Sequence, residues 1–208
     1  MSVERVIVYI DGFNLYYGMR NKLWQRYYWL NVQLLAQHLL KPGQSLIGTK
    51  YFTSRVSSTP RDPKKSNRQN RYLEALGTLA NVDIFYGHYL EKTVKCFRCG
   101  AKWQLPEEKM TDVNIAVEMM VDAFQDRWDA ALLISGDSDL TAPIMNIRHS
   151  FPTKRVVVAF PPDRHSAQLK KSADAYFTIG RRNLSISQFP DIVRKADGFE
   201  LARPVEWR

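Results

Sequence analysis

The chain has 208 residues, of which 45% are hydrophobic and 25% charged, a balance that fits one well-buried core and excludes a disordered chain. No apolar run approaches the roughly 20 residues of a membrane-spanning helix. The first residues also lack the apolar stretch of a signal peptide, so we expect a cytoplasmic protein without a membrane partner. The formal net charge of +9 favours association with nucleic acid, with general solubility as the alternative explanation.

Apolar runs rich in β-branched residues alternate with segments that have the caps and periodicity of helices. Strands are predicted over residues 5–10, 45–56, 82–89, 130–135, 155–160 and 175–179. Helices are predicted over residues 13–22, 32–40, 70–79, 112–124, 142–149 and 166–173. The helix over 112–124, capped by Thr111 or Asp112, is apolar at almost every position, which predicts burial on more than one side. The alternation predicts an α/β fold, a three-layer α/β/α sandwich around a central, mainly parallel sheet.

A small hairpin or knuckle is predicted over residues 90–106, inserted between core elements, and it carries the only two cysteines, Cys96 and Cys99. A closed zinc site needs four ligands. The nearest histidine in the sequence is His88, so Zn²⁺ would need histidines or the cysteine pair of a second copy in a homodimer. A reduced pair without metal is the alternative, and the helix that starts at a redox Cys-x-x-Cys motif is missing.

Four aspartates lie where predicted strands end or a helix begins, namely Asp11, Asp112, Asp137 and Asp139. If the first and fourth strands are neighbours in the sheet, their carboxyl ends meet at the edge where open α/β folds bind ligands. Clustered carboxylates repel one another, and a hard divalent cation such as Mg²⁺ or Mn²⁺ is the usual reason to gather them. Each aspartate alone could be a cap or turn residue. Their joint placement predicts metal-assisted chemistry on a phosphodiester.

Three segments, YIDGFNL (9–15), EKMTDVNIAVEMM (108–120) and LLISGDSDL (132–140), resemble the NYN domain family, a branch of the PIN-like nucleases. The segment HSAQLKKSADAYF (165–177) also resembles the last helix of the family. The resemblance covers roughly residues 3–179. We therefore expect a PIN-like NYN domain over residues 1–182, with a C-terminal extension over residues 183–208 that packs on it.

The resemblance implies metal-dependent cleavage of RNA and gives roles to individual residues. It implies metal-binding acids at Asp11, Asp112, Asp137 and Asp139, with Asn14 orienting a water or contacting a phosphate. Ser135 and Thr141 are expected to hold the carboxylates in place.

Basic residues near the acidic segments are candidates for RNA contacts. A predicted basic loop opens onto a helix and carries Arg61, Lys64, Lys65, Arg68 and Arg71, while Lys109 precedes Asp112 by three residues. A second group lies near the ends of later strands, namely Arg164, Lys170, Lys171, Arg181 and Arg182. Such contacts position RNA without reading its sequence. The aromatic residues at 16–17, 24 and 27–29 either stack on unpaired bases or lie in the core or at a dimer contact, and the second reading is favoured.

These features together predict a Mg²⁺- or Mn²⁺-dependent endoribonuclease that hydrolyses phosphodiester bonds, with single-stranded RNA as its substrate. The alternative is a non-catalytic RNA-binding or regulatory adaptor with the same fold. A small-molecule phosphohydrolase is disfavoured, because the first motif is Asp-Gly-Phe-Asn rather than the Asp-x-Asp of a phospho-aspartate mechanism.

Overall fold

Six parallel strands form the central sheet, in the order β3-β2-β1-β6-β7-β8. In this computed structural model, residues 3–208 are described, including all their side chains except those of 89–92 and 103–109. The strands are β1 (Glu4–Asp11), β2 (Gln44–Thr53), β3 (Val82–Tyr86), β6 (Ala130–Ile134), β7 (Arg155–Phe160) and β8 (Ala175–Thr178). Because the chain builds outward from β1 on one side and from β6 on the other, the strand order reverses between these two central strands.

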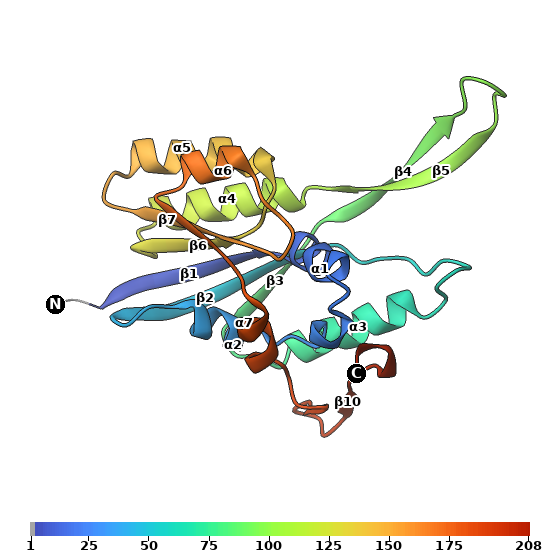
Figure 1. The fold of residues 1–208 in the computed structure, drawn as a ribbon, viewed down its shortest axis with the longest axis horizontal. Helices are drawn as coiled ribbons and strands as arrows, with labels where there is room; N and C mark the ends of the chain where they lie inside the picture. The colour runs from blue at the N-terminus through green and yellow to red at the C-terminus, as the bar shows by residue number, and fades with distance from the viewer. Residues whose placement is uncertain (1–2) are drawn as a thin grey trace.

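Helices cover both faces of the sheet, which confirms the predicted three-layer α/β/α sandwich (Figure 1). One face carries α1 (Gly12–Asn21), α2 (Val32–Leu39), α3 (Lys65–Leu76) and α7 (Arg181–Ile186). The other face carries α4 (Thr111–Phe124), α5 (Thr141–Ser150) and α6 (Ala167–Ser172). Two short 3₁₀ helices, η1 (Gln25–Tyr27) and η2 (Ser138–Leu140), complete these layers.

The alternation of side chains along β1 divides the core into two clusters. Val8 and Ile10 point toward the α1 side, whereas Ile7 and Tyr9 point toward the α4 side. All four are at most 2% exposed, as expected for a strand buried on both faces. The pairing between β1 and β6 runs from Val6 to Ile10, so that the residues after each strand emerge at the same edge.

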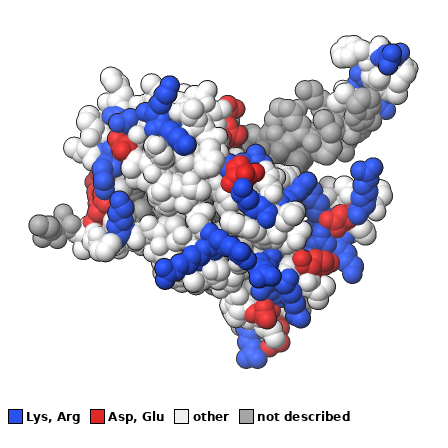
Figure 2. All heavy atoms as spheres, in the orientation of Figure 1, with Lys and Arg blue, Asp and Glu red and all other residues white. Residues whose placement is uncertain are grey.

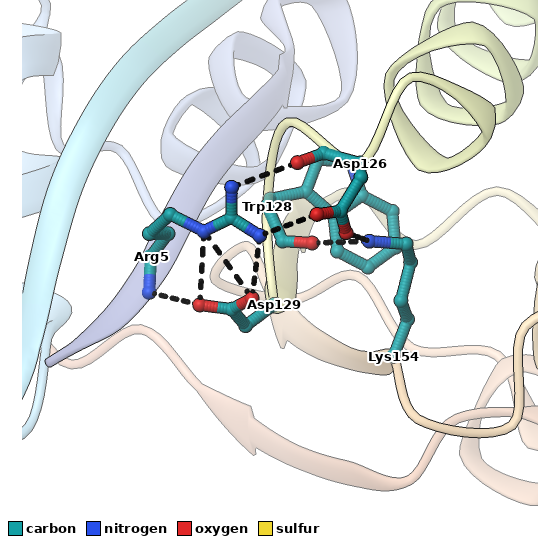
Figure 3. A network of polar contacts seen from close by, with 5 residues as sticks. All are labelled: Arg5, Asp126, Trp128, Asp129 and Lys154. Carbon is teal, nitrogen blue, oxygen red and sulfur yellow. Dashed lines mark hydrogen bonds and ion pairs between the residues drawn. The ribbon is translucent and has the colours of Figure 1, made fainter. Parts of the chain in front are cut away.

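A polar network fixes the opposite, amino-terminal edge of the sheet (Figure 3). Arg5 Nη2 lies 2.7 Å from Asp129 Oδ1 and 3.2 Å from Asp126 Oδ2, and its Nη1 donates to the Asp126 carbonyl. Lys154 Nζ joins them through Asp126 Oδ1 at 2.6 Å and the Trp128 carbonyl at 2.7 Å. Hydrogen bonds from Arg5 lower the pKa of Asp129 to about 2. The network ties the starts of β1, β6 and β7 together and so helps hold the register of the strands that position the other edge.

Two predicted boundaries in the middle of the chain were wrong. The helix predicted from residue 70 begins at Lys65, so Lys65, Arg68 and Arg71 are helical and do not lie in a loop. Basic side chains do not prevent a helix, and Leu73 and Leu76 supply the buried contacts that stabilise this one. The strand predicted over 82–89 is interrupted at Gly87, because the chain there leaves the sheet and enters the hairpin.

The predicted insertion is a two-stranded antiparallel hairpin of β4 (His88–Lys95) and β5 (Lys102–Lys109). It extends away from the body of the protein, and the cysteine pair lies in the turn at its tip (Figure 1). The hairpin is longer than predicted because its strands continue to within two residues of the flanking elements β3 and α4.

Helix α4 corrects two further predictions. Its N-cap is Met110, with a left-handed φ of 77°, instead of Thr111 or Asp112. The helix is also buried on one side only, because Val113, Val117 and Val121 are 55%, 51% and 41% exposed. These valines are four residues apart and therefore share the outer face of a surface helix.

The inner face of α4 carries a buried charge. Asp122 is fully buried, and its Oδ2 accepts from Lys50 Nζ at 2.5 Å and from the Tyr9 hydroxyl at 2.6 Å. Lys50 also donates to Glu118 Oε2 at 2.6 Å. Ionic groups so far from water are tolerated because each has a hydrogen-bonding partner.

The last part of the chain lies against the α1 side of the sandwich. Beyond α7 it forms a small antiparallel sheet of β9 (Ile192–Arg194) and β10 (Glu200–Ala202), then η3 (Val205–Trp207). Trp207 is 8% exposed and its ring lies near Tyr28, Trp29 and Tyr72. Among residues 3–208, no helix is long and apolar enough to cross a bilayer.

Candidate functional site

Asp11 lies at the carboxyl end of the central strand β1 and is 3% exposed. Its Oδ1 accepts from the Asn14 backbone N–H and its Oδ2 from the Ser135 hydroxyl, both at 2.9 Å. Burial raises the pKa of Asp11 to about 6; the hydrogen bonds from Asn14 and Ser135 oppose this rise, and the charge of Asp137 adds to it. The same carboxylate caps α1, so the start of that helix is built around it.

Asn14 joins the two central strands across this edge. Its Oδ1 accepts from the Gly136 backbone N–H at 3.1 Å, while its backbone N–H bonds to Asp11. A Cβ at Gly136 would lie 2.9 Å from Arg164 Cβ, so only glycine fits between these two segments. The segment that follows β6 is thereby held close to the end of β1.

Asp137 and Asp139 lie in the turn that leads from β6 into η2. The Asp137 backbone N–H donates to Ser135 Oγ at 3.0 Å, and Asp137 Oδ1 caps η2 by accepting from the Asp139 N–H at 3.0 Å. Asp137 is half-buried, whereas Asp139 is exposed. Ser135 therefore connects Asp11 with the backbone of Asp137, in agreement with the neighbouring strands assumed from the sequence.

Asp112 lies in the first turn of α4, which packs against both β1 and η2. This helix begins on the side of the sheet where β1 ends (Figure 1). Thr141, the first residue of α5, has a buried hydroxyl oxygen without a hydrogen-bond partner among the described residues.

We call the edge that carries Asp11, Ser135, Asp137 and Asp139 the acidic edge. Its side chains carry the donor atoms that a hard cation prefers. They are carboxylate and hydroxyl oxygens, as in most Mg²⁺ sites, without thiolate or imidazole. The Thr141 hydroxyl oxygen, which lacks a partner among the described residues, could coordinate a cation at this edge. A cation would also stabilise the ionised form of Asp11, whose pKa is raised by burial. In the described part of the chain, however, no three acidic, histidine or cysteine side chains are close enough to form a complete metal site. The residues fit such an ion in chemical type, and the four carboxylates do not form one closed cluster.

Arg164, which the sequence placed in the second basic group near the ends of later strands, packs directly on the segment that follows β6. Its backbone and Cβ pack on Gly136, and its guanidinium carbon lies 5.9 Å from the centre of the Tyr17 ring. Its Nε is buried and has no hydrogen-bond partner in the part of the chain described. The loop that follows β7 thus packs on the segment after β6, and it directs the guanidinium of Arg164 toward Tyr17 of α1.

The basic residues expected to bind RNA occupy different surroundings. Arg61 and Lys64 are exposed in the loop before α3, and Arg71 is exposed on the helix itself. Arg68 is instead held by Asp62 at 2.5 Å and Glu206 at 3.5 Å. The side chain of Lys109 lies outside the described residues. On the face shown in Figure 2, Lys and Arg side chains gather over the part that carries α1, α3 and α7.

The aromatic residues of α1 and of the segment that follows it divide between the core and a pocket. Trp29 is fully buried, and Tyr27 is 7% exposed. Tyr16, Tyr17 and Tyr28 line a pocket between α1, α3 and the C-terminal segment. The pocket begins at Gly12, directly after Asp11.

The cysteine pair forms a tight turn at the hairpin tip. The Cys96 carbonyl accepts from the Gly100 N–H at 2.9 Å, and Gly100 has a φ of +72°. Backbone N–H groups of Cys99 and Arg98 lower the pKa of the Cys96 thiol. Both thiols are free, and no third ligand for zinc lies beside them among the described side chains.

Comparisons with known proteins agree with this geometry. The chain is 27% identical over 229 aligned residues to the 6-hydroxy-3-succinoylpyridine 3-monooxygenase HspA of Pseudomonas putida, covering 91% of this chain and 71% of that protein. A crystal structure of a protein of unknown function from Vibrio parahaemolyticus has the same fold, with a TM-score of 0.56 and 20% identity over 86% of this chain and 95% of that one. The sequence model of the NYN domain matches residues 5–184, which cover most of the chain, including every residue of the acidic edge. The chain therefore belongs to the NYN domain family.

Proposed function

We propose that the protein is a divalent-metal-dependent endoribonuclease whose site is the acidic edge at the ends of β1 and β6. The observation that carries this proposal is the hydrogen-bonded set of Asp11, Asn14, Ser135 and Asp137, which joins two central strands at their reversal point. NYN domains belong to a nuclease-like superfamily, and the basic surface beside the edge suits a polyanion such as RNA.

Asp11, Asp137, Asp139 and Asp112 would hold Mg²⁺ or Mn²⁺, with Thr141 as a supporting donor. When bound, the ion would supply charge neutralisation at the phosphate and acidify a water. The proton of the attacking water would pass to solvent, because a bound cation would favour the carboxylate form of Asp11, whose pKa burial raises to about 6 without metal. Ser135 and Asn14 keep its carboxylate in one orientation. As the water oxygen bonds to phosphorus, the bond from phosphorus to the leaving ribose oxygen breaks, and that oxygen takes a proton from solvent. Arg164 would bind the phosphate.

The test is cleavage of labelled single-stranded RNA by wild type and Asp137→Asn in Mn²⁺, Mg²⁺ or EDTA. Asparagine keeps the Oδ1 that caps η2, so the fold should survive. We expect metal-dependent cleavage that falls by at least about 100-fold in the variant. Asp83→Asn, at an exposed position of β3, serves as the matched control and should cleave like wild type. RNA left intact by the wild-type protein in both metals would overturn the proposal.

A non-catalytic RNA-binding adaptor is a second candidate. It is favoured by one observation, the lack of a closed group of three ligands among the described side chains. In that case RNA binding should weaken steeply with salt and be unaffected by EDTA, without turnover.

A reaction on a small aromatic molecule is a third candidate. The Pseudomonas putida relative is named as a monooxygenase of a substituted pyridine, and the chain has an aromatic-lined pocket beside Asp11. Direct incubation with hydroxylated pyridine carboxylates under air, with and without a nicotinamide reductant, would show this activity as loss of the substrate absorbance.

A further inference from the structure

The pocket beside Asp11 has the size and shape of a ligand site. It has a volume of about 390 Å³ and lies between α1, the end of β2, α3 and η3. Small-molecule sites usually enclose about 300–1,000 Å³. A Cβ at Gly12 would lie 2.6 Å from the Tyr51 ring, so α1 starts in close contact with this wall of the pocket. The acidic edge and the pocket thus meet at Asp11 and Gly12.

Seven of the residues that line the pocket are aromatic, and several of their rings contact one another. Tyr16 and Tyr28 have ring centroids 4.8 Å apart, and Tyr28 meets Trp207 edge-on at 5.7 Å. Tyr72 meets both Trp207 and Tyr51 edge-on, at 6.2 and 6.3 Å. Such contacts hold the rings without a ligand, so the pocket is pre-formed for another planar ring.

The pocket wall also contains a hydrogen-bonding group, the hydroxyl of Tyr51. The residue as a whole is 6% exposed, and its ring and hydroxyl lie against Gly12 at the start of α1. A tyrosine in a pocket wall presents an aromatic face together with a hydrogen-bond donor. A ligand with a hydrogen-bond acceptor beside its ring would match both.

The charges around the pocket favour an anion. Arg68 is compensated by Asp62 and by Glu206, which also lines the pocket. Arg20 and Lys65 line the pocket as well, and neither forms an ion pair with a described residue. Two cations are therefore left without an acidic partner at the rim of an aromatic cavity.

We propose that this pocket binds a planar aromatic ring that carries an anionic group, with the ring among the tyrosines and the anion on Lys65 and Arg20. A base and phosphate of RNA and a small aromatic carboxylate share this chemistry. The C-terminal segment supplies Glu206 and Trp207, which lie beyond the residues that match the NYN domain, so this wall belongs to the extension. A ligand held here would lie directly beside Asp11.

Isothermal titration calorimetry in EDTA tests the proposal without any cleavage. The probes are uridine and adenosine 5′-monophosphates for the nucleotide source, and pyridine-3-carboxylate and benzoate for the other source. Uridine, adenosine and inorganic phosphate each supply only half of the ligand. We expect at least one complete probe to bind about ten-fold more tightly than its halves. Binding by nucleotides only, or by carboxylates only, would support the pocket and identify its natural ligand class.

Variants distinguish binding in the pocket from attraction to the positive charge of the protein as a whole. Lys65→Ala and Arg20→Ala should each weaken binding by about ten-fold. Lys41→Ala removes an exposed charge outside the pocket and should leave binding unchanged. Tyr51→Phe keeps the ring and should weaken binding by a few-fold. Failure of every complete probe to saturate at millimolar concentration, or equal binding by phosphate alone, would overturn the proposal. Loss of RNA cleavage in Asp137→Asn with binding intact would leave the pocket standing.

Discussion

Replacing Asp11 by asparagine should stabilise the metal-free protein at neutral pH. Folding raises the pKa of this carboxyl from its usual 3.8 to about 6, mainly through burial. A shift of about 2 units corresponds to about 3 kcal/mol against the ionised form. Asparagine carries no charge, and its Oδ1 can still accept the hydrogen bond from the Asn14 N–H. We therefore expect urea denaturation at pH 7.5 in EDTA to show a gain of about 1–3 kcal/mol in the free energy of unfolding.

The difference in the free energy of unfolding between Asp11→Asn and wild type should also change with pH. Because folding raises the pKa of Asp11, the stability from its protonated form is complete below about pH 4 and is lost as the pH rises through about 6. The difference between Asp11→Asn and wild type should therefore grow between pH 4 and 6 and stay constant above pH 7. The exposed Asp83→Asn should follow wild type throughout.

Two results would refute this reasoning. One is a variant less stable than wild type at pH 7.5, and the other is a stability difference that does not change with pH. Added Mn²⁺ provides a further measure, because an ion that binds only the folded state raises its stability. We expect Mn²⁺ to raise the melting temperature of wild type and to have a smaller effect on Asp11→Asn.

Three further predictions concern the rest of the structure. Asp122→Ala should lower the free energy of unfolding in urea by about 3 kcal/mol, because it removes the fully buried partner of Lys50; an unchanged midpoint would contradict this. Gly12→Ala should lower it by about 1–3 kcal/mol, since the added Cβ would lie 2.6 Å from Tyr51, and a neutral effect would mean that α1 shifts freely. Two thiolates fill half of a tetrahedral zinc site. We therefore expect zinc in purified protein only together with a dimer that Cys96→Ser abolishes, and a zinc-bound monomer would exclude the shared site.

Local sequence patterns were sufficient to predict the fold class and to predict which aspartates would lie at the acidic edge. A run of buried β-branched residues that ends in Asp11 encodes a central strand and its carboxyl end, because alternation and burial are local properties of a sequence. Local sequence patterns also predicted a strand over 130–135, which the structure has over 130–134, the strand over 155–160 and the Asn31 cap of α2. The family resemblance then supplied expected roles for the aspartates, and the family itself is confirmed.

Tertiary structure decided what surrounds these residues. The one-sided burial of α4, the position of Arg164 on Gly136 and the pocket wall supplied by Trp207 join segments far apart in the chain. Desolvation, which raises the pKa of Asp11, likewise depends on the atoms packed around the carboxyl group. Periodicity shows which residues prefer to be buried, but only packing decides which partner covers them, and the chemistry of this edge depends on those partners.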